Sequence, residues 1–344
     1  STEKGNSNQD QLKEILYNNE KENYYRYIDS NQIFEGENDY IRLSESSDSN
    51  SELQNFILKK ISSNYKSLNN YFSVNQGVIS GCDRLTKEQK NKFNINNNLE
   101  LNDGIFVFDL KNNRDLDVIK AFNNSEKKYL KDFYKNSDIQ KYITNIEPNK
   151  KLLYLSWDVN IEMLPNIKSH LKKFEKILKG RLETYNENYP WYSLNRPRNI
   201  NIFLKEKIVV PYRSKLNTFG YNEQEWFCRS DCYLITKKSN NISLKALLGI
   251  LNSKLYYFWL FFRGKRKGNT LELFSTPLSE MPIKILDNEI LIKIETLVDQ
   301  IINNNFSSNL ELKSEIDKII NKAYGLNDKE IDFVENFYIK KEIN

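Results

Sequence analysis

Short apolar runs separated by polar turns make up most of the chain from about Tyr71 to residue 236. The runs are rich in Ile, Val, Leu and Tyr, which is typical of strands that lie at least partly in a core. The predicted strands are residues 74–79, 105–109, 152–155, 202–204, 208–210 and 233–236. This part of the chain is therefore predicted to be rich in strands.

A basic amphipathic helix is predicted between these strands. Its apolar positions recur at steps of three or four residues and form one stripe, at Ile167, Leu171, Phe174, Leu178, Leu182 and Tyr185. The other faces carry six basic residues and one acidic residue between positions 168 and 181. Such a face is usually only solvated, but Lys172, Lys176 and Arg181 also make it a candidate contact for phosphates.

Helical spacing returns in the last sixty residues. Two apolar stripes are predicted, at Ile290, Ile294, Leu297 and Ile301, and at Leu312, Ile316, Ile319 and Ala323. Gly325 is a stop signal, and Asn327 with Glu330 has the spacing of a capping box at the start of a final helix. The chain is therefore predicted to end in a set of helices.

These patterns predict an α+β fold, with a strand-rich body, an intervening basic helix and a C-terminal helical tail. Residues 1–52 are polar, with acidic and Asn/Ser clusters, and predict a loosely packed lead-in that is followed by a short helix over 53–61. The predicted parts are a lead-in at 1–68, the body at 69–286 and a helical segment at 287–344.

The most apolar run, residues 255–262, is too short to cross a bilayer, which takes about 20 residues. We therefore expect this run in the core and no membrane partner.

Composition argues against several kinds of active site. The chain has one histidine, His170, and three cysteines, Cys82, Cys228 and Cys232. Only Cys228 and Cys232 are close together and no second pair exists, so the ligand spacing of the common zinc sites is absent, and three cysteines argue against a disulfide-stapled domain. His170 lies in the lysine-rich helix, a poor setting for a Ser-His-Asp or Cys-His site. No two glycines have G-x-G spacing and no two prolines are adjacent, so a methyltransferase-type glycine turn and an Asn-Pro-Pro-aromatic motif are absent. We therefore predict no catalytic residue, metal site or cofactor site in this chain.

Charge is unevenly distributed along the chain. Residues 1–60 contain twelve acidic and seven basic residues, which leaves +10 for the rest of a chain whose net charge is +5. This asymmetry is typical of a basic module with a less basic leader, and an anionic partner is expected. The low cysteine content favours a reducing, cytoplasmic location.

A second basic segment lies between residues 195 and 217, where six basic residues and one acid are interspersed with Ile and Val. Arginine can present its planar fork to guanine O6/N7 or to phosphate, and asparagine can pair with adenine. The candidate contacts are Arg196, Arg198, Arg213, Lys215 and Asn217, although an edge strand with solvated arginines would use the same residues. The surrounding aromatic residues could stack on exposed bases, but at least half of them are expected in the core.

Two further segments are candidates for nucleic-acid contact. In residues 76–81 (QGVISG), two glycines flank the strand-like pair Val-Ile. This pattern suggests that the backbone comes close to another group at Gly77 and Gly81. Gln76 and Ser80 are then candidate side chains for reading bases. A bulged hairpin would use the same residues. Residues 263–268 (RGKRKG) predict a flexible loop, whose Lys265, Arg266 and Lys267 suit phosphates better than base edges.

Several short motifs occur in the order found in one known family. They are 75–81 (NQGVISG), 136–142 (NSDIQKY), 181–183 (RLE), Trp191, 196–198 (RPR), 207–211 (KIVVP), 251–254 (LNSK), 281–283 (MPI) and 315–326 (EIDKIINKAYGL). Together they resemble the TaqI-like C-terminal specificity domain of adenine-specific DNA methyltransferases, many of which are fused type IIG restriction–modification enzymes. The resemblance runs from about residue 71 to 338.

The resemblance implies a target-recognition module for double-stranded DNA. In that family a preceding domain binds S-adenosylmethionine and methylates an adenine that is flipped out of the duplex. This chain is then the recognition half of a larger enzyme or a separate specificity subunit, with a methyltransferase domain or subunit N-terminal to it. A metal-dependent nuclease with scattered carboxylates, and an interaction scaffold whose basic faces reflect composition alone, remain alternatives.

Overall fold

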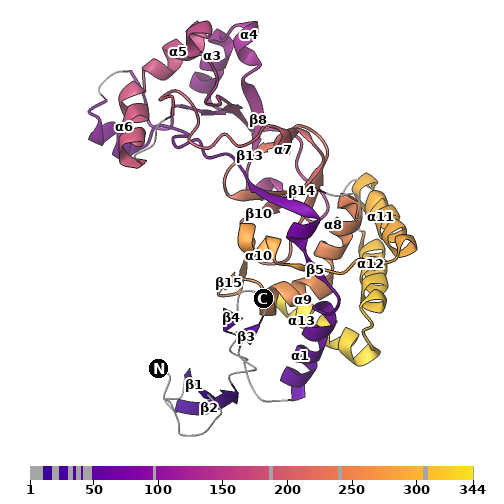
Figure 1. Ribbon diagram of the computed structural model, residues 1–344. Helices are drawn as coiled ribbons and strands as arrows, with labels where there is room; N and C mark the ends of the chain where they lie inside the picture. The colour runs from indigo at the N-terminus through magenta and orange to yellow at the C-terminus, as the bar shows by residue number, and fades with distance from the viewer. Residues whose placement is uncertain are drawn as a thin grey trace. The chain divides into compact units, whose positions relative to one another are not determined.

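The computed structural model describes the chain apart from residues 1–10, 18–22, 30–33, 36–39, 42–48, 96–97, 186–188, 239–241, 305–308 and 344 (Figure 1). It divides into two compact units, Ser1–Lys59 and Lys60–Asn344. In the first unit, two antiparallel pairs form, β1 (Gln11–Tyr17) with β2 (Asn23–Asp29) and β3 (Phe34–Glu35) with β4 (Tyr40–Ile41). The sequence analysis did not predict these strands, and the rest of the polar lead-in lies outside the described residues. The short helix predicted over 53–61 is confirmed as part of α1 (Ser49–Ile61).

In the second unit, a four-stranded antiparallel sheet has the order β12-β10-β14-β6. Its strands are β6 (Phe72–Gln76), β10 (Lys207–Pro211), β12 (Gly220–Asn222) and β14 (Cys232–Lys237). All five residues of β10 are buried, because the strand is paired on both sides and carries a continuous Ile-Val-Val run. The strands predicted at 208–210 and 233–236 are confirmed, whereas the one predicted at 74–79 ends at Gln76.

A second sheet has the order β13-β8-β9-β7. Its strands are β7 (Val107–Asp109), β8 (Leu130–Tyr134), β9 (Lys150–Leu153) and β13 (Phe227–Cys228), and only the β13–β8 pair is parallel. Buried residues from this sheet share one hydrophobic cluster with residues of the predicted basic helix, among them Phe108, Leu152, Ile167 and Phe174. The strand predicted at 105–109 is confirmed, although it begins two residues later, and the strand predicted at 152–155 lies two residues earlier.

Two smaller sheets complete the strands of this unit. One is three-stranded, of order β11-β16-β15, with β11 (Arg213–Ser214), β15 (Arg266–Lys267) and β16 (Thr270–Glu272). The other pairs β5 (Lys66–Ser67) with β17 (Pro282–Ile283). The flexible loop predicted for residues 263–268 is therefore partly wrong, because Arg266 and Lys267 pair with β16 in a hairpin whose turn contains Gly268 at φ +60°.

The predicted basic helix is two helices. α5 (Pro165–Lys172) and α6 (Glu175–Tyr185) are separated at Lys173 and Phe174. There the backbone N–H of Phe174 bonds to the carbonyl of Leu171 at 2.9 Å, a tighter turn than that of an α-helix. Phe174 is almost fully buried, so the break accompanies the insertion of its ring into the core. The side chains of Leu182 and Tyr185 lie outside the described residues.

The strand predicted at 202–204 is wrong, because these residues form the short helix α7 (Asn201–Leu204). Three apolar residues cannot distinguish a strand from one helical turn by period alone. Phe203 is buried by this turn, and its carbonyl accepts the backbone N–H of Trp226 at 3.0 Å.

The remaining helices of the second unit include four short ones and the helical tail (Figure 1). The short helices are α2 (Lys87–Lys92), α3 (Asn113–Ala121), α4 (Asn124–Lys127) and α10 (Ser275–Ser279), and the short 3-10 turns are η2 (Leu68–Asn70), η3 (Asn136–Asp138) and η4 (Ile161–Met163). The others are α8 (Leu244–Asn252), α9 (Lys254–Arg263), α11 (Asn288–Asn303), α12 (Leu310–Ala323) and α13 (Asp328–Ile343).

The most apolar run, residues 255–262, lies in the core as predicted. α9 contains the most apolar run of the chain, and all its residues from Leu255 to Phe261 are buried. Phe337 of α13 contacts this helix, with ring centroids 5.3 Å from Phe258 and 5.0 Å from Phe261. No helix in the described part of the chain is both long and apolar enough to span a membrane.

The start of α13 confirms the predicted capping box. The backbone N–H of Asn327 donates to Glu330 Oε2 at 2.7 Å, and the backbone N–H of Glu330 donates to Asn327 Oδ1 at 3.1 Å. Gly325 has the left-handed φ of +69° that the predicted helix stop requires. The α+β prediction, with a strand-rich body and a helical C-terminal tail, is therefore confirmed.

Candidate nucleic-acid interface

The 76–81 segment continues from β6 and is held between two other segments of the chain. The backbone N–H of Gly77 donates to Cys232 O at 2.9 Å, and Ile79 forms a backbone bridge with Arg196. A Cβ on Gly77 would lie 2.2 Å from Arg229 O, so this glycine is required by the chain's own backbone. The close approach predicted here is thus internal to the fold.

This segment positions an arginine beside Gln76. Arg198, at a left-handed φ of +67°, donates from Nη2 to Gln76 Oε1 at 2.8 Å and from Nε to Gly77 O at 3.3 Å. Gln76 in turn donates from Nε2 to Ser230 O at 2.9 Å. These hydrogen bonds hold the guanidinium through neutral acceptors, so its positive charge is not cancelled by them.

Arg196 adds a second positive charge next to Arg198. Burial, and then the like charge of Arg196, lowers the pKa of Arg198, although the group stays protonated because arginine starts far above neutral pH. The guanidinium of Arg196 donates to Asn195 Oδ1 at 2.8 Å. Two half-buried arginines close together favour an anion such as phosphate.

The three-stranded sheet contributes a third arginine. Arg213 donates from Nε and Nη2 to Oε1 of Glu272, at 3.0 and 2.7 Å, and its guanidinium carbon lies 5.0 Å from the ring centroid of Tyr212. The hydrogen bonds to Glu272 raise the pKa of Arg213. Its side chain is 45% exposed, whereas that of Glu272 is 9% exposed.

Aromatic rings connect these groups. The rings of Tyr212 and Tyr233 are 6.5 Å apart, and Tyr233 is paired with Gln76 across β14 and β6. Tyr233, Gln76 and Arg198 also line a cleft of about 340 Å³. We define the basic–aromatic surface as this continuous set of side chains: Gln76, Arg196, Arg198, Tyr212, Arg213 and Tyr233.

The basic hairpin belongs to the same sheet as Arg213. Lys265 and Lys267 are exposed, whereas Arg266 is half-buried with its guanidinium carbon 3.9 Å from the ring centroid of Phe261. Lys265 Nζ lies 5.0 Å from the ring centroid of Phe274, whose ring is 6.1 Å from Tyr212. The structure thus brings Lys265, which was predicted to contact phosphate, beside the basic–aromatic surface.

Two predicted contact residues instead hold the fold together. Arg181 is 6% exposed and donates to the carbonyls of Ser80, Trp191 and Ser193. Asn217 is fully buried, where its Nδ2 donates to Leu251 O and Ser253 O at 2.7 and 2.8 Å. Their assignment as DNA contacts is corrected here, because neither side chain has a solvent-facing group to offer.

The other predicted residues vary in exposure. Lys172, Lys176 and Gly81 are exposed, and Lys215 is exposed with Nζ 3.2 Å from Glu342 O. Ser80 is buried, and its hydroxyl donates to Asp83, so it is not available as a polar reader in this conformation.

Sequence reasoning missed two residues of this region. Arg229 follows β13, pairs with Asp83 at 3.6 Å and has a 58% exposed side chain. Glu272 is the carboxylate that holds Arg213. A lone arginine carries no periodic signal, but the turn residues Gly268 and Asn269 between polar strand-like flanks could have indicated the hairpin that contains Glu272.

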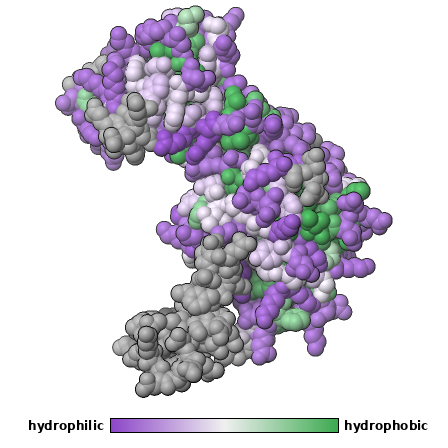
Figure 2. Space-filling model, viewed as in Figure 1, coloured by the Kyte–Doolittle hydropathy of each residue, from purple (hydrophilic) through white to green (hydrophobic). Residues whose placement is uncertain are grey.

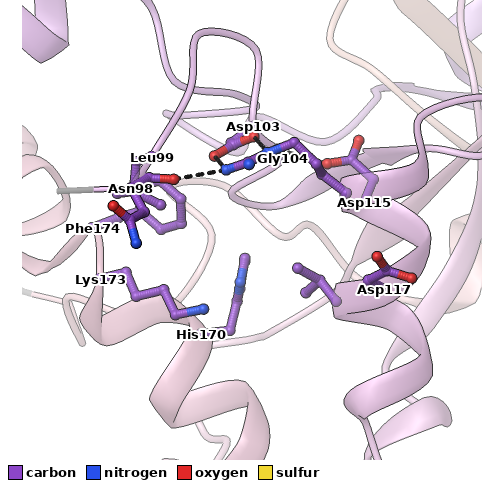
Figure 3. Close-up of a pocket in the computed structure, with 11 residues that line it drawn as sticks. Asn98, Leu99, Asp103, Gly104, Asp115, Asp117, His170, Lys173 and Phe174 are labelled. Atoms are coloured by element: carbon purple, nitrogen blue, oxygen red, sulfur yellow. Dashed lines mark hydrogen bonds and ion pairs between the residues drawn. The ribbon is translucent and has the colours of Figure 1, made fainter.

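A separate pocket of about 610 Å³ surrounds the only histidine (Figure 3). His170 Nε2 lies 3.1 Å from Ile105 O, its Nδ1 has no hydrogen-bond partner, and burial lowers its pKa to about 4. Arg114 donates to both carboxylate oxygens of Asp103 at 2.8 Å. The pocket is thus lined by this ion pair and a neutral imidazole, together with Asp115, Asp117 and Lys173.

Metal ligands are not gathered in the described part of the chain. No group of three or more His, Cys, Asp or Glu side chains there is placed to hold a metal ion. The three cysteines are buried free thiols.

Residues 119–283 match the family model of the TaqI-like C-terminal specificity domain. The chain is therefore similar to that family over this segment. The match contains seven of the motifs that suggested the resemblance, from 136–142 to 281–283, while 75–81 and 315–326 lie outside it. Within the basic–aromatic surface, every residue except Gln76 lies in the matched segment.

Curated relatives of the chain are type II methyltransferases. M.HincII of Haemophilus influenzae is 26% identical over 217 residues, which are 60% of this chain and 41% of that protein. M.MjaIV of Methanocaldococcus jannaschii is 26% identical over 226 residues, 61% of this chain and 74% of that protein. The chain thus spans only about two fifths of the length of M.HincII.

Among solved structures, the type IIL restriction-modification enzyme MmeI in complex with DNA aligns with a TM-score of 0.49 and 13% identity. The alignment covers 99% of this chain and 42% of that one. The type IIG restriction endonuclease BpuSI aligns with a TM-score of 0.49 and 11% identity, over 86% of this chain and 33% of that one.

Proposed function

We propose that this chain is a sequence-specific recognition module for double-stranded DNA, acting with an adenine-specific methyltransferase of a restriction–modification system. The observation that carries the proposal is the basic–aromatic surface, within which Arg196, Arg198 and Arg213 are held by neighbouring side chains. Fixed arginines beside aromatic rings suit phosphates and base edges. The similarity of residues 119–283 to a specificity-domain family supports this role.

Methyl transfer itself is assigned to a partner domain or subunit N-terminal to this chain. That partner would bind S-adenosylmethionine and the flipped adenine, because the chain contains neither a G-x-G turn nor adjacent prolines. The relatives' description as methyltransferases supports such a partner. We further propose a type IIG-like arrangement and a cytoplasmic location.

A charge-matched comparison tests the DNA-binding role. Arg196→Gln combined with Arg198→Gln should weaken binding of the full chain to a labelled mixed-sequence duplex by roughly tenfold, because phosphate contacts dominate affinity. Lys318→Gln with Lys329→Gln removes the same charge from exposed positions of the helical tail and should change binding much less. Equal effects of the two double variants, measured by fluorescence anisotropy, would overturn the proposed surface.

The division of labour has its own test. Calorimetry of the full chain with S-adenosylmethionine should show no binding heat, and methyl transfer to duplex DNA should require the added partner. Stoichiometric cofactor binding by this chain alone would contradict the assignment.

A further inference from the structure

The three-stranded sheet β11-β16-β15 places an acidic side chain among basic ones. Arg213 is paired with Glu272, and Lys267 with Thr270, across neighbouring strands. Alternate residues of a strand share a face, so Arg213, Lys267, Thr270 and Glu272 lie on the same side of this sheet. Leu271, fully buried, points to the other side.

A carboxylate on this face should weaken phosphate binding, because like charges repel. The contacts of the Glu272 carboxylate indicate that it holds the Arg213 guanidinium in place. Glu272 is nearly buried, and one of its oxygens accepts two hydrogen bonds from a more exposed guanidinium. The pair is therefore arranged with the carboxylate beneath and the arginine toward solvent.

Glu272 accepts hydrogen bonds from one edge of the planar Arg213 guanidinium. This arrangement determines which other edge can face a ligand. Nε and Nη2 form one side of the planar guanidinium, and both donate to Glu272 Oε1. The end of the fork, formed by Nη1 and the second hydrogen of Nη2, is turned away from the carboxylate. That end has the geometry for two adjacent acceptors, such as O6 and N7 of guanine.

Tyr212 restricts the same guanidinium from a different direction. The guanidinium carbon lies 5.0 Å from the Tyr212 ring centroid, and the backbone N–H of Leu273 bonds to Tyr212 O at 2.8 Å, joining the two segments. An arginine fixed by a carboxylate and an aromatic ring loses less conformational entropy on binding than a free one.

We propose that Glu272 is a positioning residue for base reading by Arg213, and that the base pair read there contains guanine. This inference rests on the proposed DNA-recognition function. Glu272 thereby improves discrimination at one base pair while lowering affinity for DNA of any sequence.

The test is selection of randomised duplexes by the full chain and its variants, with sequencing of the bound fraction. Arg213→Ala should remove the preference for one G·C pair. Glu272→Ala should reduce the preference at that same pair by roughly tenfold, the discrimination expected from a bidentate arginine. It should also raise affinity for non-selected DNA, because a negative charge is removed. The Arg213→Ala, Glu272→Ala double variant should discriminate no worse than Arg213→Ala alone.

Two controls separate positioning from charge and folding. Glu315→Ala removes a carboxylate that pairs with Lys293 on the helical tail, and it should leave sequence preference unchanged. Glu272→Gln keeps an acceptor oxygen and should retain more preference than Glu272→Ala. Thermal unfolding identifies any variant that loses binding through loss of structure, in which case Glu272→Gln provides the comparison.

The possible failures point to different conclusions. If the wild-type chain selects no sequence, or Arg213→Ala leaves selection unchanged, the base-reading role is overturned together with this inference. If Arg213→Ala loses the preference and Glu272→Ala keeps it in full, only the role of Glu272 is overturned. A uniform loss of all binding in Glu272→Ala and Glu272→Gln would also overturn positioning, since it indicates a purely structural carboxylate.

Discussion

Individual arginines in this chain have different roles. The residues next to each arginine in the sequence do not indicate which role it has. Arg181 lies in a helical stretch rich in lysine, yet it is buried and bonded to three backbone carbonyls. Arg213 is close to a predicted strand end and remains 45% exposed. What distinguishes them is the long-range contact of each side chain, with Ser80 in one case and Glu272 in the other.

The positions of Arg213 and the hairpin lysines predict different effects of substitution. Arg213→Ala should cost about 1–3 kcal/mol at the correct site and relax the choice of one base pair, because a fixed guanidinium is lost. Lys265→Ala with Lys267→Ala should weaken binding to all DNA sequences alike. It should also make the slope of log K against log salt concentration shallower by about one unit per charge lost. The measurement is methylation by the complete enzyme over every single-base variant of its site. Altered sequence preference in the lysine variant alone would show that these roles are reversed.

His170 should make the folded state sensitive to acid. Its pKa is lowered from 6.5 to about 4 mainly by burial, so the unfolded chain takes up a proton between these values while the folded chain does not. Stability is therefore lost as pH falls through this window, by up to about 3 kcal/mol from this group. Asp317, whose pKa burial raises to about 6, acts in the opposite direction.

The variant His170→Phe separates the contribution of His170 to the pH dependence of stability from that of the other titrating groups. It lacks the titrating ring but keeps an aromatic side chain near Phe108 and Phe174. Urea unfolding between pH 7 and 4 should show a shallower loss of stability for the variant than for the wild type. Parallel pH profiles would mean that His170 does not stay neutral in the folded chain.

At the scale of elements, strands with continuous apolar runs were predictable and short segments were not. β10 and β14 follow directly from Ile-Val-Val and Tyr-Leu-Ile runs, whose burial requires pairing on both sides. Residues 202–204 form a helical turn because Phe203 packs in the core, and α5 is separated from α6 where Phe174 enters it. Both outcomes depend on tertiary packing, which a local period does not contain.

A half-buried lysine connects the body to the helical tail. Lys141 Nζ donates to Asn217 Oδ1 at 2.9 Å, Asn252 O at 3.2 Å and Tyr338 OH at 2.9 Å. Burial lowers its pKa to about 8. These three partners come from different segments, so the ammonium joins α13 to the sheet-containing body.

Lys141→Met should therefore destabilise the chain and loosen α13. The substitution leaves three buried polar groups without their donor, at a cost of about 2–3 kcal/mol. Urea unfolding measures the stability, and hydrogen exchange should speed up in Asp328–Ile343. The exposed Lys135→Met is the control. Unchanged exchange in α13 would show that Lys141 does not hold this helix.

For the whole molecule, the sequence was sufficient for the α+β class, the helical tail and the family that residues 119–283 resemble. It did not predict the strands at the N-terminal end or the assembly of the basic–aromatic surface. That surface brings Gln76 to Arg198 and Arg213 to Glu272, pairs that are far apart along the chain. Figure 2 shows hydrophilic residues over much of the visible face, so hydropathy alone does not single out this region.

The central claim is that the described surface binds duplex DNA electrostatically and positions arginines at base edges. Its most direct test is the affinity of the full chain for a duplex as a function of salt concentration. With about five phosphates neutralised, log K should fall against log salt with a slope near −4 to −5. Substituting Arg196 and Arg198 with Gln should make that slope shallower by about two units. A flat salt response, or an unchanged slope in that variant, would contradict the account.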